Sequence, residues 1–180
     1  MSKVHLPATS IRRVLFVCMG NICRSPTMHG VFRERLRIAG LASTIEIDSA
    51  GTHGYHAGAP PDERSQAAAR RRGLDLSGLR ARNVEVQDFD FFDLILAMDD
   101  DNLESLRAMA PEQHRHKLAL LLEYSLGDVG RSVPDPYYGG PIGFERVLDI
   151  AEEAADGLLA KLTKSTAGPG AGPASGRDSR

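Results

Sequence analysis

Strand-like and helix-like patterns alternate along most of this chain. Residues 14–17 read Val-Leu-Phe-Val, a continuous β-rich run that is typical of a strand buried on both faces. Ser25 and Pro26 then mark a helix start, because serine is a common N-cap and proline fits the first helical position. Apolar residues follow at helical spacing up to Gly40. This order predicts a parallel sheet with helices on both sides.

The remaining patterns continue the alternation. In chain order they predict a strand at 44–48, a helix at 62–72, a strand at 91–97, a helix at 101–109, and a strand or buried helical turn at 118–122. The clearest helix has one apolar face made of Phe144, Val147, Leu148, Ala151, Ala154, Ala155, Leu158, Leu159 and Leu162. We therefore expect a three-layer α/β fold, with a central four-stranded parallel sheet flanked by helices on both faces.

Length and composition indicate one globular domain. The 180 residues fit a single domain, and the net charge of −2 suggests neither a nucleic acid nor an anionic membrane as partner. We expect a mobile lead at 1–10, a folded unit at 11–164 and a disordered tail at 165–180, which is rich in Gly, Pro, Ala and Ser. No apolar run has signal-peptide or membrane-spanning length, so we expect a cytoplasmic protein.

The segment after the first predicted strand carries the chemistry. Ligands of parallel α/β sheets bind beyond the carboxyl ends of the strands, and here Cys18 is followed by five residues and Arg24. Backbone N–H groups of such a loop can converge on phosphate oxygens, while Arg24 offers a bidentate pair of donors. Gly20 and Asn21 tolerate left-handed backbone angles. A thiolate at Cys18 is favoured by this positive field, and Ser25 can donate its hydroxyl to it.

Several segments together resemble one known family. Residues 17–26 read Val-Cys-Met-Gly-Asn-Ile-Cys-Arg-Ser-Pro, and residues 135–139 read Asp-Pro-Tyr-Tyr-Gly. With the matching segments at 48–52, 55–58, 62–64 and 97–99, they resemble the low-molecular-weight protein tyrosine phosphatases over nearly all of the predicted folded unit. A bare Cys-x5-Arg pattern occurs by chance. The ten-residue block followed by Asp-Pro-Tyr-Tyr is highly specific.

The resemblance implies catalytic roles. Cys18 matches the nucleophile that forms a phosphocysteine, and Arg24 matches the arginine that binds the phosphate. Asn21 and Ser25 match residues that hold the loop and stabilise the thiolate. Asp135 matches the general acid, which protonates the phenolic oxygen and then acts as base on water. Because Asp135 must arrive protonated, we expect a mildly acidic rate optimum.

The resemblance also implies a substrate. Tyr55, Tyr137 and Tyr138 match the aromatic walls of the family's cleft, which suit an aryl phosphate. The rest of the expected substrate-binding set is Met19, Gly20, Asn21, Ile22, Cys23 and Ser25. Neither a metal nor another cofactor is expected, because backbone amides and an arginine take that role. The expected partners are phosphotyrosine-containing proteins and a cognate tyrosine kinase, and the expected state is a monomer or weak dimer.

Some alternatives stay open at this stage. Cys23 is either a small core residue or a partner that forms a reversible disulfide with Cys18. Phosphoarginine phosphatases resemble this loop but carry Thr where Ile22 stands, and they lack the paired tyrosines. Arsenate reduction needs cysteines beyond Cys23, and this chain has none. A non-catalytic redox or anion-binding module would not need Asp135.

One family feature has no clear match. Many relatives carry a histidine that supports the loop, and the nearest candidate position here holds Leu79. If that histidine is missing, Ser25 and Ser49 must be positioned by other residues.

Overall fold

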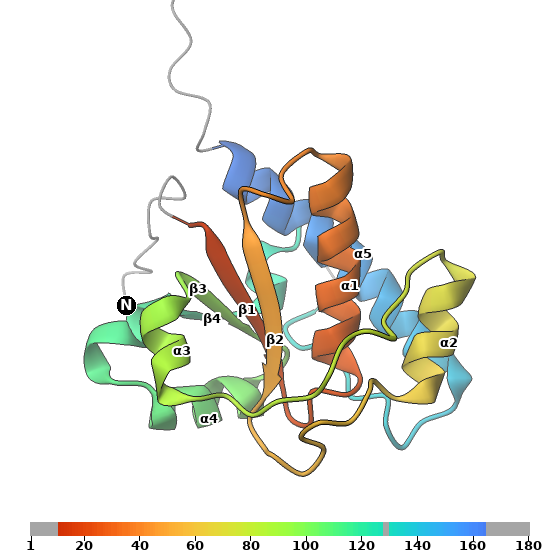
Figure 1. Ribbon diagram of the computed structural model, residues 1–180, viewed down its shortest axis with the longest axis horizontal. Helices are drawn as coiled ribbons and strands as arrows, with labels where there is room; N and C mark the ends of the chain where they lie inside the picture. Colours follow the sequence, from red (N-terminus) through yellow and green to blue (C-terminus); the bar gives the residue numbers. More distant parts are fainter. Residues whose placement is uncertain (1–10, 128–129, 165–180) are drawn as a thin grey trace, which may run out of the picture.

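Four parallel strands form one sheet in the order β2-β1-β3-β4 (Figure 1). The computed structural model describes residues 11–127 and 130–164, so the predicted lead at 1–10 and tail at 165–180 lie outside the described residues. The strands are β1 (Arg13–Cys18), β2 (Glu46–Gly51), β3 (Leu94–Ala97) and β4 (Leu118–Leu120). β1 therefore lies in the interior of the sheet, between β2 and β3.

Helices cover both faces of this sheet. Their bounds are α1 (Arg24–Ile38), α2 (Glu63–Arg71), α3 (Val86–Phe91), α4 (Asp100–Met109) and α5 (Pro141–Lys164), with short 3-10 helices at Glu112–Lys117 and Leu121–Tyr124. α1 and α5 cover one face, with α2 packed against α5, and α3 and α4 cover the other (Figure 1). This arrangement confirms the predicted three-layer α/β fold with a four-stranded parallel sheet.

Both faces of β1 are buried, as its continuous apolar run predicted. Val14 and Phe16 pack in the core beside α1 and α5, whereas Leu15 and Val17 pack in the core beside α3 and α4. All four side chains have no exposed surface. Since successive strand residues point to opposite faces, a strand in the middle of a three-layer fold needs apolar residues at every position.

The prediction was wrong around residue 91. Phe91 does not begin a strand but ends α3, a helix that the sequence patterns did not reveal, and β3 starts only at Leu94. The start of α3 is fixed by a polar contact, because the Glu85 N–H donates to Asp88 Oδ2 at 2.7 Å. A one-and-a-half-turn helix is too short to show a 3.6-residue period, so only its cap could have indicated it.

Other boundaries shift for simple reasons. β2 runs three residues beyond the predicted 44–48, because its pairing with β1 continues to the match of Cys18 with Gly51. The segment 118–122 contains both predicted forms, first β4 and then the start of a 3-10 helix. The apolar face predicted for the last helix belongs to α5 and packs in the core, with Leu159 only partly buried.

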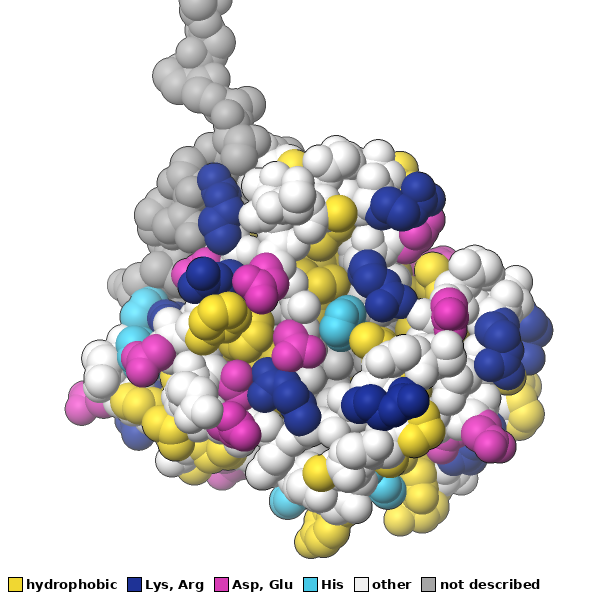
Figure 2. Space-filling model, viewed as in Figure 1, with side chains coloured by type: hydrophobic (Ala, Val, Ile, Leu, Met, Phe, Trp, Pro, Cys, Tyr) yellow, Lys and Arg dark blue, Asp and Glu magenta, His cyan; other side chains and the backbone are white. Residues whose placement is uncertain are grey.

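Charged side chains of both signs are interspersed on the face shown in Figure 2. Ion pairs also join neighbouring elements: Arg72, which follows α2, contacts Glu145, Asp149 and Glu152 of α5. Within the described ranges, no helix has the length and apolar character needed to cross a membrane.

The close approach of α5 to the second 3-10 helix gives a test of the packing. A Cβ at Gly157 would overlap the carbonyl oxygen of Tyr124, which is backbone and cannot rotate away. Alanine normally stabilises a helix interior by about 1 kcal/mol relative to glycine. We expect Gly157→Ala instead to lower the free energy of unfolding by about 1–3 kcal/mol in urea titrations.

Gly78→Ala is the matched control, because nothing lies within 4 Å of the added methyl group and Gly78 has no left-handed φ. We expect this control to change stability by less than about 1 kcal/mol. A Gly157→Ala variant as stable as the wild type would contradict the described packing of α5.

Candidate active site

The loop that joins β1 to α1, residues 18–25, forms a concave backbone surface; we call it the phosphate loop. The carbonyls of Cys18, Met19 and Ile22 accept hydrogen bonds of 2.8–3.0 Å from backbone N–H groups of the segment 52–62. In a trans peptide the C=O and the next N–H point in opposite directions. The N–H groups of residues 19, 20 and 23 therefore point to the other side of the loop. Within the described part of the chain, no N–H group of residues 19–23 has an acceptor, which is the pattern of an anion-binding nest.

Asn21 fixes the turn of this loop. Its φ is 56°, in the left-handed region that asparagine tolerates better than most residues. Its side chain bridges the loop, because Nδ2 donates to Ser25 Oγ at 2.8 Å and Oδ1 accepts from the Arg82 N–H at 3.0 Å. Gly20, which we also expected to be left-handed, is not. Gly20 instead leaves room for the His56 ring, because a Cβ at position 20 would lie only 3.0 Å from His56 Cδ2.

Ser25 is not the N-cap that the sequence suggested. The N-cap of α1 is Cys23, and Ser25 lies in the first turn with its side chain fully buried. Its hydroxyl oxygen is 3.0 Å from Cys18 Sγ. Because this oxygen already accepts a hydrogen bond from Asn21, its own hydrogen is available to the sulfur. The serine therefore serves the nucleophile and not the helix end.

Arg24 is a buried cation surrounded by acceptors. Its side chain is 3% exposed, and Nη1 donates to Asp99 Oδ2 at 2.5 Å and to the Val133 carbonyl at 3.1 Å. Nη2 lies 3.5 Å from Asp135 Oδ2. Burial alone lowers the pKa of Arg24, but the charges of Cys18, Asp99 and Asp135 outweigh it and raise this pKa above its ordinary value. The guanidinium is thus charged, and it is held by Asp99, the Val133 carbonyl and the Asp135 carboxylate.

Asp99 has a role that sequence reasoning missed. The sequence patterns predicted only the helix at 101–109, and Asp99 Oδ1 caps its counterpart α4 by accepting from the Asn102 N–H at 2.8 Å. The other oxygen pairs with Arg24. One signal for this second role was present, because residues 97–99 are among the segments that resemble the family. The patterns that indicate helix starts could not separate the two roles.

All but two of the expected residues meet in one cleft of about 390 Å³. Asn21 and Ser25 do not line it, since they lie beneath the loop surface. His56 lines it and was missed, although it stands next to Tyr55 in a segment that resembles the family. The lining residues are Cys18, Met19, Gly20, Ile22, Cys23, Arg24, Tyr55, His56, Asp135, Tyr137 and Tyr138. In the described ranges, no three His, Cys, Asp or Glu side chains are arranged to hold a metal ion.

Aromatic side chains form the rim of this cleft. The rings of Tyr137 and Tyr138 lie 4.9 Å apart at 81°, an edge-to-face arrangement. Tyr138 is 96% exposed and Tyr55 is 85% exposed, so most of their surface is free to contact a ligand. The rim therefore offers apolar area above a floor made of backbone amides, a sulfur and a guanidinium.

Comparisons with known proteins agree with this geometry. The family model described as low molecular weight phosphotyrosine protein phosphatase matches residues 13–167. The low molecular weight protein-tyrosine-phosphatase YfkJ of Bacillus subtilis is 44% identical over 151 residues, which cover 84% of this chain and 96% of that protein. The chain belongs to the low-molecular-weight protein tyrosine phosphatase family.

Solved structures of family members have the same fold. The crystal structure of YfkJ has a TM-score of 0.82 and 42% identity, and it covers 88% of this chain and 98% of its own. The protein tyrosine phosphatase of Entamoeba histolytica, crystallised with Hepes in its active site, has a TM-score of 0.83 and 39% identity. That match covers 87% of this chain and 99% of the other.

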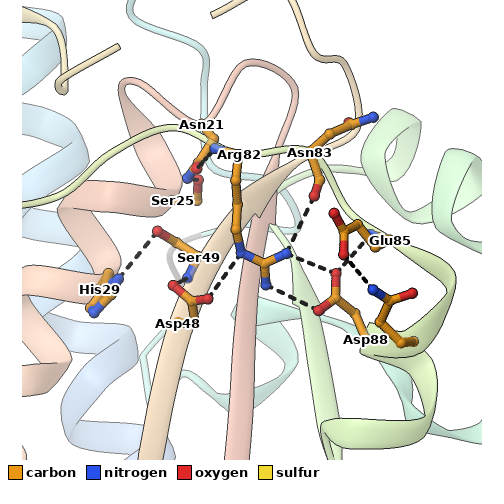
Figure 3. A network of polar contacts seen from close by, with 10 residues as sticks. Asn21, Ser25, His29, Asp48, Ser49, Arg82, Asn83, Glu85 and Asp88 are labelled. Carbon is orange, nitrogen blue, oxygen red and sulfur yellow. Dashed lines mark hydrogen bonds and ion pairs between the residues drawn. The ribbon is translucent and has the colours of Figure 1, made fainter. Parts of the chain in front are cut away.

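In this family member a histidine from α1 contacts Ser49. The expected position holds Leu79, but His29 Nδ1 lies 3.2 Å from Ser49 Oγ (Figure 3). His29 is buried, and this burial lowers its pKa to about 4. The imidazole is therefore neutral at neutral pH. Ser25, in turn, accepts a hydrogen bond from Asn21. His29 therefore positions Ser49, and Asn21 positions Ser25.

Arg82 ties the phosphate loop of this phosphatase-family chain to the sheet and to α3. Its guanidinium lies between Asp48 and Asp88, with Nε–Oδ2 and Nη1–Oδ2 distances of 3.0 Å each (Figure 3). Its backbone N–H is the donor to Asn21. Through one residue, the middle of β2 and the first turn of α3 are therefore linked to the left-handed turn of the loop.

The two cysteines have different surroundings. Both line the cleft and are nearly buried, with Cys18 3% and Cys23 5% exposed. Cys18 Sγ contacts Ser25 Oγ and lies near the charge of Arg24, whereas Cys23 lies near the negative charge of Asp62. Burial, together with the nearby charge of Asp62, raises the pKa of Cys23 to about 12. Both cysteines are free thiols in the structure.

His29 predicts an acid sensitivity of folding. Its pKa is about 4 in the folded chain and about 6.5 in the unfolded chain, so its neutral form supports folding above pH 6.5. That support is lost as the pH falls from 6.5 through about 4, and the loss amounts to about 2 kcal/mol at about pH 5. The free energy of unfolding is measured in urea above pH 6.5 and at about pH 5. We expect His29→Gln to lose less of this free energy on acidification than the wild type does. Equal losses in the two proteins would show that His29 is not held neutral.

The cysteines predict selective alkylation. Iodoacetamide reacts with thiolates, and Cys23 with a pKa of about 12 is almost wholly protonated at neutral pH. We expect mass spectrometry after brief treatment to find the label on Cys18, and Cys18→Ser to remain unlabelled. Inorganic phosphate is expected to slow the labelling by occupying the loop. Rapid labelling of Cys23 in the Cys18→Ser protein would contradict this difference.

Proposed function

We propose that this chain hydrolyses phosphotyrosine on proteins through a phosphocysteine intermediate. The observation that carries the proposal is that Cys18, Arg24 and Asp135 line one cleft, with Arg24 Nη2 3.5 Å from the Asp135 carboxylate. The cleft floor has donors for a phosphate, a nucleophile in their midst and a carboxyl group above them. These are the parts that a two-step phosphoryl transfer needs.

In the first step, the Cys18 thiolate attacks the phosphorus and the bond to the phenolic oxygen breaks. The phosphate-loop N–H groups and Arg24 bind the three remaining oxygens and stabilise the charge that they carry in the transition state. Asp135 gives its proton to the phenolic oxygen, so that tyrosine leaves as a neutral phenol. The Asp135 side chain is 45% exposed, which lets it exchange protons with solvent between turnovers.

In the second step, a water molecule attacks the phosphocysteine. Asp135, now a carboxylate, takes one proton from this water, and the sulfur–phosphorus bond breaks. The Ser25 hydroxyl, 3.0 Å from Cys18 Sγ, donates to the sulfur as its negative charge returns. Inorganic phosphate leaves, and the enzyme regains its thiolate and its protonated acid.

The rim supports an aryl phosphate as the substrate. Tyr55, Tyr137 and Tyr138 offer ring surfaces to a phenyl group entering the cleft, and the paired tyrosines favour phosphotyrosine over phosphoarginine. A cognate tyrosine kinase is the class of enzyme that would supply this substrate. The free thiols support a reducing compartment, and we propose the cytoplasm.

Hydrolysis of a phosphotyrosine peptide by matched variants tests the proposal. We expect Cys18→Ser to have no detectable turnover, because a serine hydroxyl is a far weaker nucleophile at this pH. Asp135→Ala is expected to lower kcat/KM by about 10²–10³-fold, the usual contribution of a general acid. Asp101→Ala is the control, because it removes a carboxylate that lies on α4 and does not line the cleft. We expect this variant to keep the wild-type rate.

Two outcomes would overturn the assignment. Undiminished turnover by Cys18→Ser would exclude the cysteine as nucleophile. A phosphoarginine peptide hydrolysed faster than the phosphotyrosine peptide would move the substrate class to the alternative.

A further inference from the structure

We propose that Arg64 is a positioning residue that holds the general-acid segment, residues 133–140, in place over the phosphate loop. This inference rests on the proposed function, because it concerns how Asp135 reaches the leaving group. Arg64 lies at the second position of α2, and its Nη1 donates to the carbonyl of Tyr137 at 3.1 Å. Its guanidinium also lies 5.5 Å from the ring centre of Tyr137 and 4.6 Å from that of Phe144. One side chain thus contacts the segment through its backbone and through a ring.

The same guanidinium is anchored on the opposite side to the phosphate loop. Arg64 Nε and Nη2 donate to the two carboxylate oxygens of Asp62 at 3.0 and 2.9 Å, a bidentate pair. The Asp62 N–H in turn donates to the Ile22 carbonyl at 2.8 Å. Tyr137 closes the path, because its N–H donates to Asp135 Oδ1 at 3.1 Å. The loop that holds the phosphate and the residue that protonates the leaving group are therefore joined through Arg64.

The general-acid segment depends on this contact because it has little structure of its own. Before Asp135 it is tied to Met98, the residue after β3, because the Val133 N–H donates to the Met98 carbonyl at 2.8 Å. After Asp135, within the described residues 136–140, the bond from Arg64 to the Tyr137 carbonyl is the one hydrogen bond that reaches another part of the fold. Removing it leaves this side of the segment without a hydrogen bond to the α2 end of the site, although Pro136 stays buried against Gly143.

Arg64 is not a second phosphate-binding arginine. It does not line the cleft, and each of its three nitrogens already donates, two of them to Asp62 and one to Tyr137. The hydrogen bonds from Arg64 also hold the pKa of Asp62 below its usual range. The pair therefore stays charged at mildly acidic pH.

A loosened acid has a recognisable kinetic signature. Protonation of the leaving oxygen matters most when the leaving group is a poor one, such as phenol, and least when it is a good one, such as 4-nitrophenol. A misplaced acid should therefore lower kcat/KM for phenyl phosphate more than for 4-nitrophenyl phosphate. A general loss of folding would lower both equally and would weaken binding of inorganic phosphate.

The experiment compares kcat/KM for both substrates in the wild type, Arg64→Met and Arg64→Lys. We expect Arg64→Met to lower the value for phenyl phosphate by about 10-fold and that for 4-nitrophenyl phosphate by less than about 3-fold. Inhibition by inorganic phosphate should stay within about 2-fold of wild type, because Arg24 and the loop amides are untouched. Arg64→Lys should recover only part of the loss, since one ammonium cannot reproduce the bidentate pair and the third bond together.

Arg71→Met is the matched control. Arg71 is on the same helix and pairs with Glu145 of α5, so its loss removes an ion pair of α2 without touching the general-acid segment. We expect its ratio of the two kcat/KM values to equal that of the wild type.

The inference is overturned by an active Arg64→Met protein with the wild-type ratio, or by equal losses on both substrates together with weaker phosphate inhibition. If Arg64→Met does not fold, Arg64→Lys decides by the same ratio. A wild type that hydrolyses neither substrate would refute the proposed function, whereas an active wild type with an unchanged ratio in the variants refutes this inference alone.

Discussion

The burial of the Arg24 guanidinium is the constraint on which the rest of the site depends. A charged group removed from water is costly unless its donors are bonded and its charge is balanced. Here the balance comes from three parts of the chain: the sulfur at the end of β1, Asp99 at the start of α4, and Asp135 before α5. The three-layer fold brings these parts together because the strands are parallel and their carboxyl ends lie at one edge of the sheet. Satisfying one buried cation therefore also assembles a nucleophile and an acid.

Much of this arrangement could be predicted from the sequence. The run at 14–17, the proline near the start of α1 and the apolar face of α5 are strong local signals, and they gave the layers and the position of the loop. The cleft residues followed from a distinctive spacing and its family resemblance. The first kind of signal comes from residues that are close together in the chain. The second comes from a motif that is long enough to be specific.

What could not be predicted depended on contacts between distant segments. Ser25 looks like a helix cap because serine usually is one, yet its hydroxyl is directed to Cys18 by Asn21. His29 contacts Ser49 across twenty positions, and nothing in its local sequence marks it. Asp99 serves two partners, of which only the helix N–H is local. In each case the decisive contact is to a residue that is distant in the chain, whereas sequence patterns indicate only local roles.

The outward carbonyls of the phosphate loop have a thermodynamic consequence. Their bonds to the segment 52–62 orient the inward N–H groups before any ligand arrives, so the entropy of ordering that backbone is lost once, when the chain folds. An incoming oxyanion has only to displace water. Affinity for the anion is consequently set in part by residues that never touch it: a change that frees the backbone around Thr52 or His53 would weaken capture while leaving every chemical group of the cleft intact.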